Sequence, residues 1–134
     1  MPVFVDSSVL IDVVGTPGPW REWSEVTLRA AAEQHVLVVN PIVLGEVSMG
    51  FDSIEALEEA LPAETYRREG IPLPAAFLAG RCFLDYRRRG GSRTGVLPDF
   101  YIGAHAAVAG YRLLTRDAAR YRTYFPRLEL ITPS

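Results

Sequence analysis

The sequence contains no lysine, and each of its 14 basic residues is an arginine. This absence excludes mechanisms that need a lysine amine, such as Schiff-base formation or the lysine of a phosphate-binding loop. A single cysteine, Cys82, excludes an internal disulfide and any zinc or iron–sulfur site built from several cysteines. The chemistry open to this chain therefore rests on carboxylates, hydroxyls and guanidinium groups.

Long apolar runs are also missing. No run reaches the length of a membrane-spanning helix, and the opening segment MPVFVDSS has no basic region before an apolar core. We therefore expect a cytoplasmic protein with no membrane segment. The chain has 134 residues, 49% of them hydrophobic, which is enough for one packed interior. We expect residues 1–134 to form a single domain.

The small formal net charge of −2 conceals two unlike halves. Residues 1–80 carry 12 acidic residues and 4 arginines, a net of −8, whereas residues 81–134 carry 4 acidic residues and 10 arginines, a net of +6. Such a division can create a local surface for anions. The two halves can equally neutralise each other across the fold, so the sequence leaves both interpretations open.

Short aliphatic runs alternate with helical patterns along the chain. Strands are predicted at Val3–Val5, Val36–Val39, Arg112–Thr115 and Leu128–Ile131. Helices are predicted at residues 7–14, 20–31, 41–50, 54–61, 75 to about 90, 99–109 and 117–124. This alternation predicts an α/β/α sandwich around a mostly parallel sheet. The segment RRRGGSRTG, residues 87–95, is the best candidate for a mobile loop.

Two aspartates follow predicted strands. Asp6 comes directly after VFV, and Asp117 comes two residues after the strand that ends in LLT. Ligands of open α/β sheets bind beyond the carboxyl ends of the strands, so both aspartates are expected on the same edge of the sheet. Each aspartate alone also fits an ordinary helix cap or turn.

Two further acids interrupt apolar helix faces. Glu46 lies among the apolar residues of PIVLGEVSMG, and Asp99 is in line with Ile102 and Ala106 on its helix. An acid turned toward the core needs a partner, because unpaired carboxylates are almost never fully buried. For Asp99, an N-cap directly after Pro98 is the competing interpretation.

Four carboxylates in one region repel one another, and a divalent cation relieves that repulsion. Oxygen ligands without histidine or cysteine suit Mg²⁺ or Mn²⁺. The chemistry that such an ion supports is phosphodiester hydrolysis, because the ion stabilises charge on phosphoryl oxygens and lowers the pKa of an attacking water.

The segments VDSSVLID, PIVLGEV, LPDFYIGAHA and LLTRDAARY occur in an order and spacing that resemble the PIN-domain ribonucleases. The likeness is closest to the VapC toxins of bacterial toxin–antitoxin pairs and extends over essentially the whole chain. It implies a PIN-like α/β/α fold. It assigns catalysis and metal binding to Asp6, Glu46, Asp99 and Asp117, and it places the hydroxyls of Ser8 and Thr115 beside the metal ligands or the phosphate.

The activity implied by this resemblance is Mg²⁺-dependent endoribonuclease cleavage of structured cellular RNA, with Mn²⁺ able to substitute. The implied partners are a small VapB-like antitoxin and a second copy of the chain in a homodimer. After Asp117 this chain has Ala118 and Ala119, where some relatives carry a further acid. The number of metal ions, one or two, therefore stays open.

Four arginines precede the predicted Asp99 helix, namely Arg87, Arg88, Arg89 and Arg93. They are candidates for contacts to RNA phosphates, and a solvated helix end explains them equally well. His105 lies six residues after Asp99 and should face elsewhere, so we expect a structural role for it. Two other functions remain open: a PIN-like nuclease for DNA or flapped nucleic acid, and a non-catalytic protein-binding module with the same fold.

Overall fold

A computed structural model describes residues 1–93 and 95–133 of the chain. Its centre is a five-stranded sheet with the order β3-β2-β1-β4-β5, in which every neighbouring pair is parallel. The strands are β1 (Val3–Val5), β2 (Leu37–Val39), β3 (Tyr66–Arg68), β4 (Arg112–Leu114) and β5 (Leu130–Ile131). The prediction of an α/β fold around a mostly parallel sheet is confirmed.

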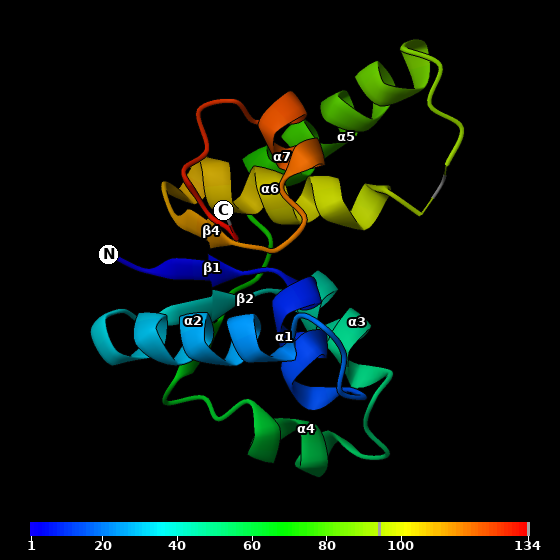
Figure 1. The fold of residues 1–134 in the computed structure, drawn as a ribbon. Helices are drawn as coiled ribbons and strands as arrows, with labels where there is room; N and C mark the ends of the chain where they lie inside the picture. Colours follow the sequence, from blue (N-terminus) through cyan, green and yellow to red (C-terminus); the bar gives the residue numbers. More distant parts are fainter. Residues whose placement is uncertain (94, 134) are drawn as a thin grey trace.

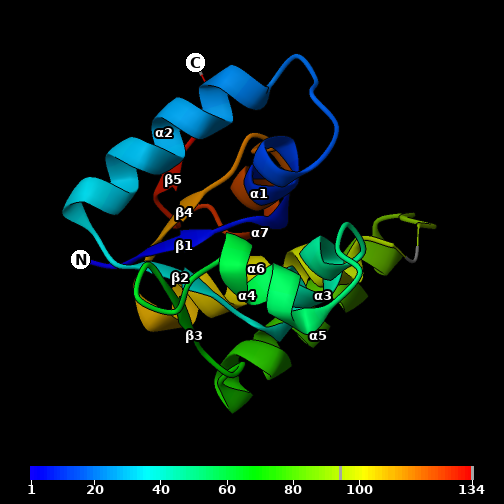
Figure 2. The ribbon, with the colours of Figure 1, turned by 90° about the horizontal axis from the view of Figure 1, so that it is seen from below.

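Helices cover both faces of this sheet (Figure 1). They are α1 (Ser7–Val14), α2 (Arg21–Gln34), α3 (Pro41–Ser48), α4 (Ile54–Ala60), α5 (Leu73–Arg88), α6 (Leu97–Ala109) and α7 (Ala119–Tyr124). Helices α1 and α2 pack together on one face, whereas α6 lies on the other with α5 and α7 against it (Figure 1 and Figure 2). None of the helices in the described residues is long and apolar enough to cross a membrane.

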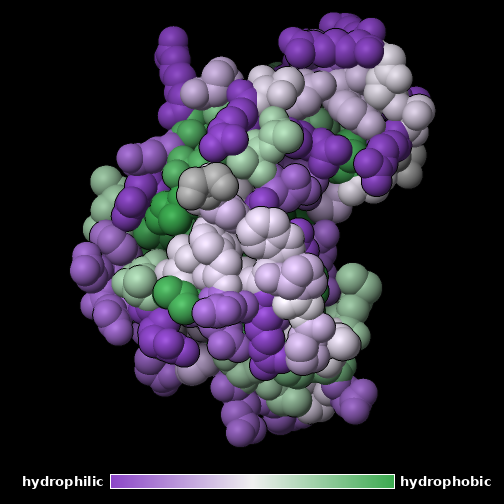
Figure 3. Space-filling model, in the orientation of Figure 1, coloured by the Kyte–Doolittle hydropathy of each residue, from purple (hydrophilic) through white to green (hydrophobic). Residues whose placement is uncertain are grey.

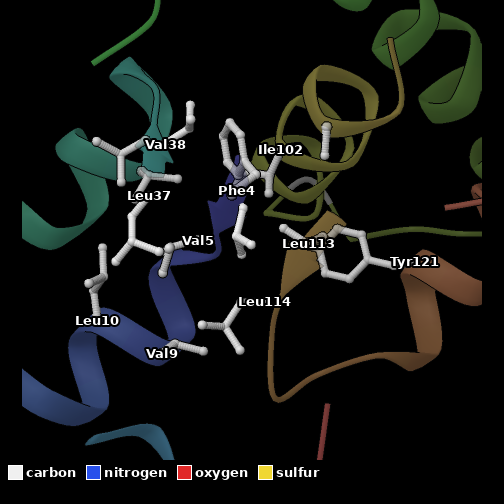
Figure 4. Close-up of a cluster of buried hydrophobic side chains, with 14 of the residues drawn as sticks. Phe4, Val5, Val9, Leu10, Leu37, Val38, Ile102, Leu113, Leu114 and Tyr121 are labelled. Atoms are coloured by element: carbon white, nitrogen blue, oxygen red, sulfur yellow. The ribbon is translucent and has the colours of Figure 1, made fainter. Parts of the chain in front are cut away.

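The central strands β1 and β2 are buried on both faces, and each of their side chains is 0% exposed. A strand covered by helices on both faces needs apolar side chains in both directions, which is why these strands are unbroken apolar runs in the sequence. Figure 4 shows Val9 and Leu10 of α1 and Ile102 of α6 packed into the same cluster. This packing fixes β1, and with it the residue that follows β1.

The edge strand β3 was not among the predicted strands. Its sequence is Tyr-Arg-Arg, and only Tyr66 is buried, whereas Arg67 and Arg68 are exposed. An edge strand with two charged residues has no apolar run and no alternation long enough to be recognised. The prediction of β2 was one residue too long, because Val36 lies outside the strand and is exposed.

The start of α3 is held by a buried polar network. The side chain of Asn40 caps the helix, accepting a hydrogen bond from the backbone N–H of Val43 at 3.0 Å. The Asn40 amide also meets Nδ1 of His105 at 3.1 Å, and Nε2 of His105 lies 3.2 Å from a Glu69 carboxylate oxygen. His105 is fully buried, and these contacts give it the structural role expected from its position. Burial lowers the pKa of His105.

Candidate active site

The carboxyl ends of the neighbouring strands β1 and β4 lie side by side, because these strands pair in parallel with Val5 opposite Leu114. Asp6 follows β1, and its backbone N–H donates to the carbonyl of Leu114 at 2.9 Å. Thr115 follows β4 directly. In Figure 1 this edge of the sheet faces right, where α1, α3 and the first turn of α6 come together. Asp6 thus lies at the edge expected from its place in the sequence.

Asp6 is a buried carboxylate held through one oxygen. Its side chain is 4% exposed. Thr115 Oγ1 and Ser8 Oγ both donate to Asp6 Oδ2, at 2.6 Å and 3.0 Å. Burial raises the pKa of Asp6, and these two hydrogen bonds offset part of that effect. The second oxygen, Oδ1, receives from the described side chains only a long contact of 3.5 Å from Ser7 Oγ, so it retains capacity for another ligand.

Ser7 connects Asp6 to Glu46. Its hydroxyl donates to Glu46 Oε1 at 2.7 Å across the packed pair of helices α1 and α3. Glu46 is partly buried, in agreement with its position in an apolar helix face. The structure therefore brings these two predicted acids together through a hydroxyl that the sequence reasoning did not single out.

Asp99 lies in the first turn of α6. The helix begins at Leu97 with Val96 as its N-cap, so the alternative of Asp99 as the N-cap is wrong. Asp99 Oδ2 forms an ion pair with Arg120 Nη1 of α7 at 2.5 Å. Arg120 was not a predicted site residue, and it brings a positive charge to the edge where the acids gather.

The pKa of Asp99 is raised to about 6. Burial is the largest cause, followed by the negative charge of Asp6, and Glu46 adds to it; the ion pair with Arg120 opposes them. Asp99 therefore lies within electrostatic reach of two other predicted acids. The single positive charge of the Arg120 guanidinium does not balance the negative charges of these three carboxylates.

Asp117 is the most exposed of the four predicted acids. It precedes α7, which begins at Ala119 and is shorter than predicted, and its backbone N–H donates to Thr115 Oγ1 at 3.1 Å. The adjacent Arg116 forms an ion pair with the nearly buried Asp12 of α1 at 2.7 Å. The backbone of this loop is thus anchored at the same edge, while the Asp117 carboxylate faces solvent.

Within residues 1–93 and 95–133, no three His, Cys, Asp or Glu side chains lie close enough to hold one metal ion. Glu46 is engaged by Ser7 and Asp99 by Arg120, which keeps these carboxylates in other hydrogen bonds. The donor set nevertheless fits a divalent cation: it consists of oxygens alone, and burial together with the negative charges of Asp6 and Glu46 raises the pKa of Asp99. Side-chain rotation is therefore needed before the carboxylates can share an ion.

A buried hydroxyl beside these acids supports the same interpretation. Tyr121 is 2% exposed, and its hydroxyl has no hydrogen-bond partner among the described residues. Burial raises the pKa of Tyr121 well above its usual value, and all four predicted acids add to the shift, namely Asp6, Asp99, Glu46 and Asp117. Tyr121 thus stays protonated and can donate one hydrogen bond to an oxygen at this site.

Comparison with known families agrees with the sequence resemblance. A family model described as PIN domain matches residues 3–126. The chain belongs to the PIN-domain family. Comparison of the sequence with curated proteins gives no significant match.

Solved structures of similar fold include a toxin–antitoxin complex and a toxin. VapBC-1 from nontypeable Haemophilus influenzae has a TM-score of 0.73 at 16% identity, with 98% of each chain covered. A toxin–antitoxin complex from Klebsiella pneumoniae has a TM-score of 0.71 at 22% identity, again with 98% of each chain covered. VapC20 from Mycobacterium tuberculosis, a sarcin–ricin loop cleaving toxin, has a TM-score of 0.63 at 18% identity, covering 90% of this chain and 94% of that one. At these identities the likeness establishes the shared fold.

The four candidate RNA-binding arginines lie at the tip of α5 in this PIN domain. Arg87 and Arg88 belong to the last turn of the helix rather than to a loop, and both are exposed. Arg89 forms an ion pair with Asp85 at 3.1 Å, and Arg93 is exposed beyond the left-handed Gly90. Thr94, within the predicted loop, lies outside the described residues.

The surface between this tip and α3 is hollowed (Figure 3). Hydrophilic side chains cover the end of α5 above the hollow, and the chain that follows α5 leads into the first turn of α6 (Figure 1 and Figure 3). Because Asp99 lies in that turn, the arginines are connected to the acidic edge of the PIN domain by a short stretch of chain.

The unpartnered hydroxyl of Tyr121 leads to a stability prediction. Tyr121→Phe should stabilise the metal-free PIN domain by about 1 kcal/mol, because it removes a buried polar group without a partner and retains the packed ring. Urea unfolding in the presence of EDTA measures this difference. Tyr124→Phe is the matched control, since Tyr124 is a partly exposed ring of the same helix and should change stability little. Destabilisation of Tyr121→Phe by more than 1 kcal/mol would mean that the hydroxyl has a strong partner.

Proposed function

We propose that this chain, as a single PIN domain over residues 1–134, is a cytoplasmic Mg²⁺-dependent endoribonuclease of the VapC type. The observation that carries the proposal is the gathering of acids at one edge of the sheet, where burial, and after it the charges of Asp6 and Glu46, raises the pKa of Asp99 to about 6. One protein of similar fold is a toxin that cleaves the sarcin–ricin loop, which supports structured RNA as the substrate class.

The residues assigned to the ion are Asp6, Glu46, Asp99 and Asp117. When bound, Mg²⁺, or Mn²⁺ in its place, stabilises charge on the phosphoryl oxygens and lowers the pKa of a water nucleophile. The chain prepares for this by fixing Asp6: Thr115 and Ser8 hold Oδ2 and leave Oδ1 for the ion. A ligand fixed in this way before binding loses little conformational freedom when the ion arrives.

The direct test of this function is cleavage by the purified protein. Incubation with structured RNA should give discrete fragments in Mg²⁺ or Mn²⁺ and none in EDTA, and sequencing of the RNA ends identifies the cut site. DNA of the same sequence, offered in competition, should stay intact. Preferential cleavage of DNA would replace the proposal with a DNA nuclease, and absence of both cleavage and metal binding would replace it with a non-catalytic binding module.

We also propose that the chain is the toxin of a toxin–antitoxin pair, that it forms a homodimer, and that a VapB-like antitoxin is its partner. The solved complexes of similar fold support the antitoxin. Two large apolar side chains of α5, Leu73 and Phe77, are 82% and 68% exposed, which supports a protein contact on this helix. The toxin and its antitoxin, expressed together, should purify as one complex without RNA cleavage.

The arginines at the tip of α5 lead to a binding prediction. Replacing Arg87, Arg88, Arg89 and Arg93 with glutamine should weaken RNA binding. It should also reduce the magnitude of the slope of log K against log salt by about 2 to 3, because a protein that contacts fewer phosphates releases fewer counterions from the RNA on binding. Fluorescence anisotropy in Ca²⁺ at several salt concentrations measures the slope. Arg21→Gln with Arg29→Gln on α2 is the control. An unchanged slope would identify the tip as a solvated helix end.

A further inference from the structure

Arg120 is the one basic side chain paired with a predicted metal ligand among the described residues. Its Nη1 lies 2.5 Å from Asp99 Oδ2, and the two side chains are 25% and 30% exposed. The pair joins α7 to the first turn of α6, and its two residues are 21 positions apart in the sequence. An ion pair between exposed side chains usually contributes little to the stability of the fold. This one occupies a carboxylate that the proposed reaction requires.

The position of Arg120 is fixed by its helix. Its neighbour Tyr121 is buried at 2% exposure, and Phe125 directly after α7 is buried against α6, where its ring lies 2.4 Å from the position that a Cβ on Gly103 would take. The backbone of α7 therefore cannot carry Arg120 away from the acidic edge. Only the side chain can rotate, and it stays within reach of whatever binds there.

A divalent ion and Arg120 compete for the negative charge of the Asp99 carboxylate. Asp99 Oδ2 accepts from the guanidinium, and a carboxylate that serves as a metal ligand must turn an oxygen to the ion. The ion also brings two positive charges where the guanidinium brings one, which matches an edge where Asp6 and Glu46 add to the charge of Asp99. Binding of the ion thus favours release of Arg120.

We propose that Arg120 is the internal counter-ion of the metal-free site, that a divalent ion displaces it from Asp99, and that the freed guanidinium then contacts a phosphate of the bound RNA. The last step rests on the proposed function. A guanidinium presents a planar fork of donors that matches phosphate oxygens, and none of the four acids remains free to accept from Arg120 once the ion holds them. Arg120 serves the chain twice, as a substitute cation and as a phosphate ligand.

The first test is metal affinity without RNA. Arg120→Gln should bind Mn²⁺ about tenfold more tightly than wild type in isothermal titration calorimetry, because the competing charge is gone. Arg120→Lys keeps the charge and should stay near wild type. Arg122→Gln is the matched control, since Arg122 is an exposed residue of the same helix. Unchanged or weaker Mn²⁺ binding by Arg120→Gln would overturn the displacement.

The second test is cleavage at saturating Mn²⁺. Arg120→Gln should cleave RNA at least about tenfold more slowly than wild type despite its tighter metal binding, with Arg120→Lys between them. Full cleavage by Arg120→Gln would overturn the phosphate contact. If wild type itself does not cleave RNA, the proposed function fails, and the Mn²⁺ titration still decides whether Arg120 is displaced. Circular dichroism of each variant confirms that the fold is retained.

Discussion

Asp6→Asn abolishes metal-dependent RNA cleavage, with an expected loss of about 1,000-fold or more, while the protein stays folded. The reason is that Asp6 is the acid that the structure holds most rigidly, 4% exposed and bound by two hydroxyls through Oδ2. An amide has the same shape but only one oxygen and no charge, so it cannot bind an ion and accept both hydroxyls. A loss of about 1,000-fold corresponds to about 4 kcal/mol of transition-state stabilisation.

The measurement is the initial rate of RNA cleavage by purified protein at saturating Mg²⁺, with circular dichroism to verify the fold. Asp52→Asn is the control, because Asp52 is an exposed acid in the loop between α3 and α4 and is not a predicted metal ligand, and its cleavage rate should equal that of wild type. Full activity of Asp6→Asn would exclude this carboxylate from the reaction, and with it the proposed metal centre.

Asp99 makes the metal-free wild-type protein lose stability as the pH rises from about 4 to above 6, and Asp99→Asn removes this contribution, whereas the contribution of Asp6, whose pKa burial also raises, remains in both proteins. The folded-state pKa of Asp99 is about 6, against an ordinary value of 3.8. A group with a raised folded pKa stabilises fully below its unfolded pKa, and that stability disappears as the pH passes the folded value. One pKa unit is about 1.4 kcal/mol, so the loss is up to about 3 kcal/mol.

Urea unfolding of wild type and Asp99→Asn in EDTA, at pH values from 4 to 8, measures this difference. The two proteins should converge near pH 4, and the variant should be the more stable at pH 7.5 even though it loses the ion pair with Arg120. Mg²⁺ should then raise the melting temperature of wild type more than that of the variant, because it relieves the repulsion that the variant lacks. A variant less stable than wild type at pH 7.5 would show that the ion pair outweighs the repulsion.

Much of the fold was predictable because its signals are local. The aliphatic runs of β1 and β2 exist because both strands are covered on two faces, and the alternation with helices then indicates a parallel sheet. β3 carries no such signal, since two of its three side chains point to solvent. Its pairing with β2 is decided by tertiary contact, which a sequence window does not contain.

Some residues of the candidate site are likewise indicated by the local sequence, and others are not. The sequence singles out Asp6 by its place at the end of a strand, and Glu46 by the apolar residues around it. Ser7, Arg120 and Tyr121 were missed, because what distinguishes them is a partner far away in the sequence or the lack of one. A serine in a cap, an arginine on a short helix and a tyrosine in an apolar pattern are each ordinary until the chain is folded.

The order of the strands also has a consequence for biosynthesis. Strand β1 lies at the centre of the sheet, but one of its two neighbours, β4, spans Arg112–Leu114 and is made long after it. Until those residues leave the ribosome, β1 has an open side, and Asp6 lacks the hydroxyl of Thr115. The Asp6 carboxylate therefore gains its hydrogen bond from Thr115 only after β4 has been made, and a molecule that binds the first half of the chain can arrive before this edge of the sheet is complete.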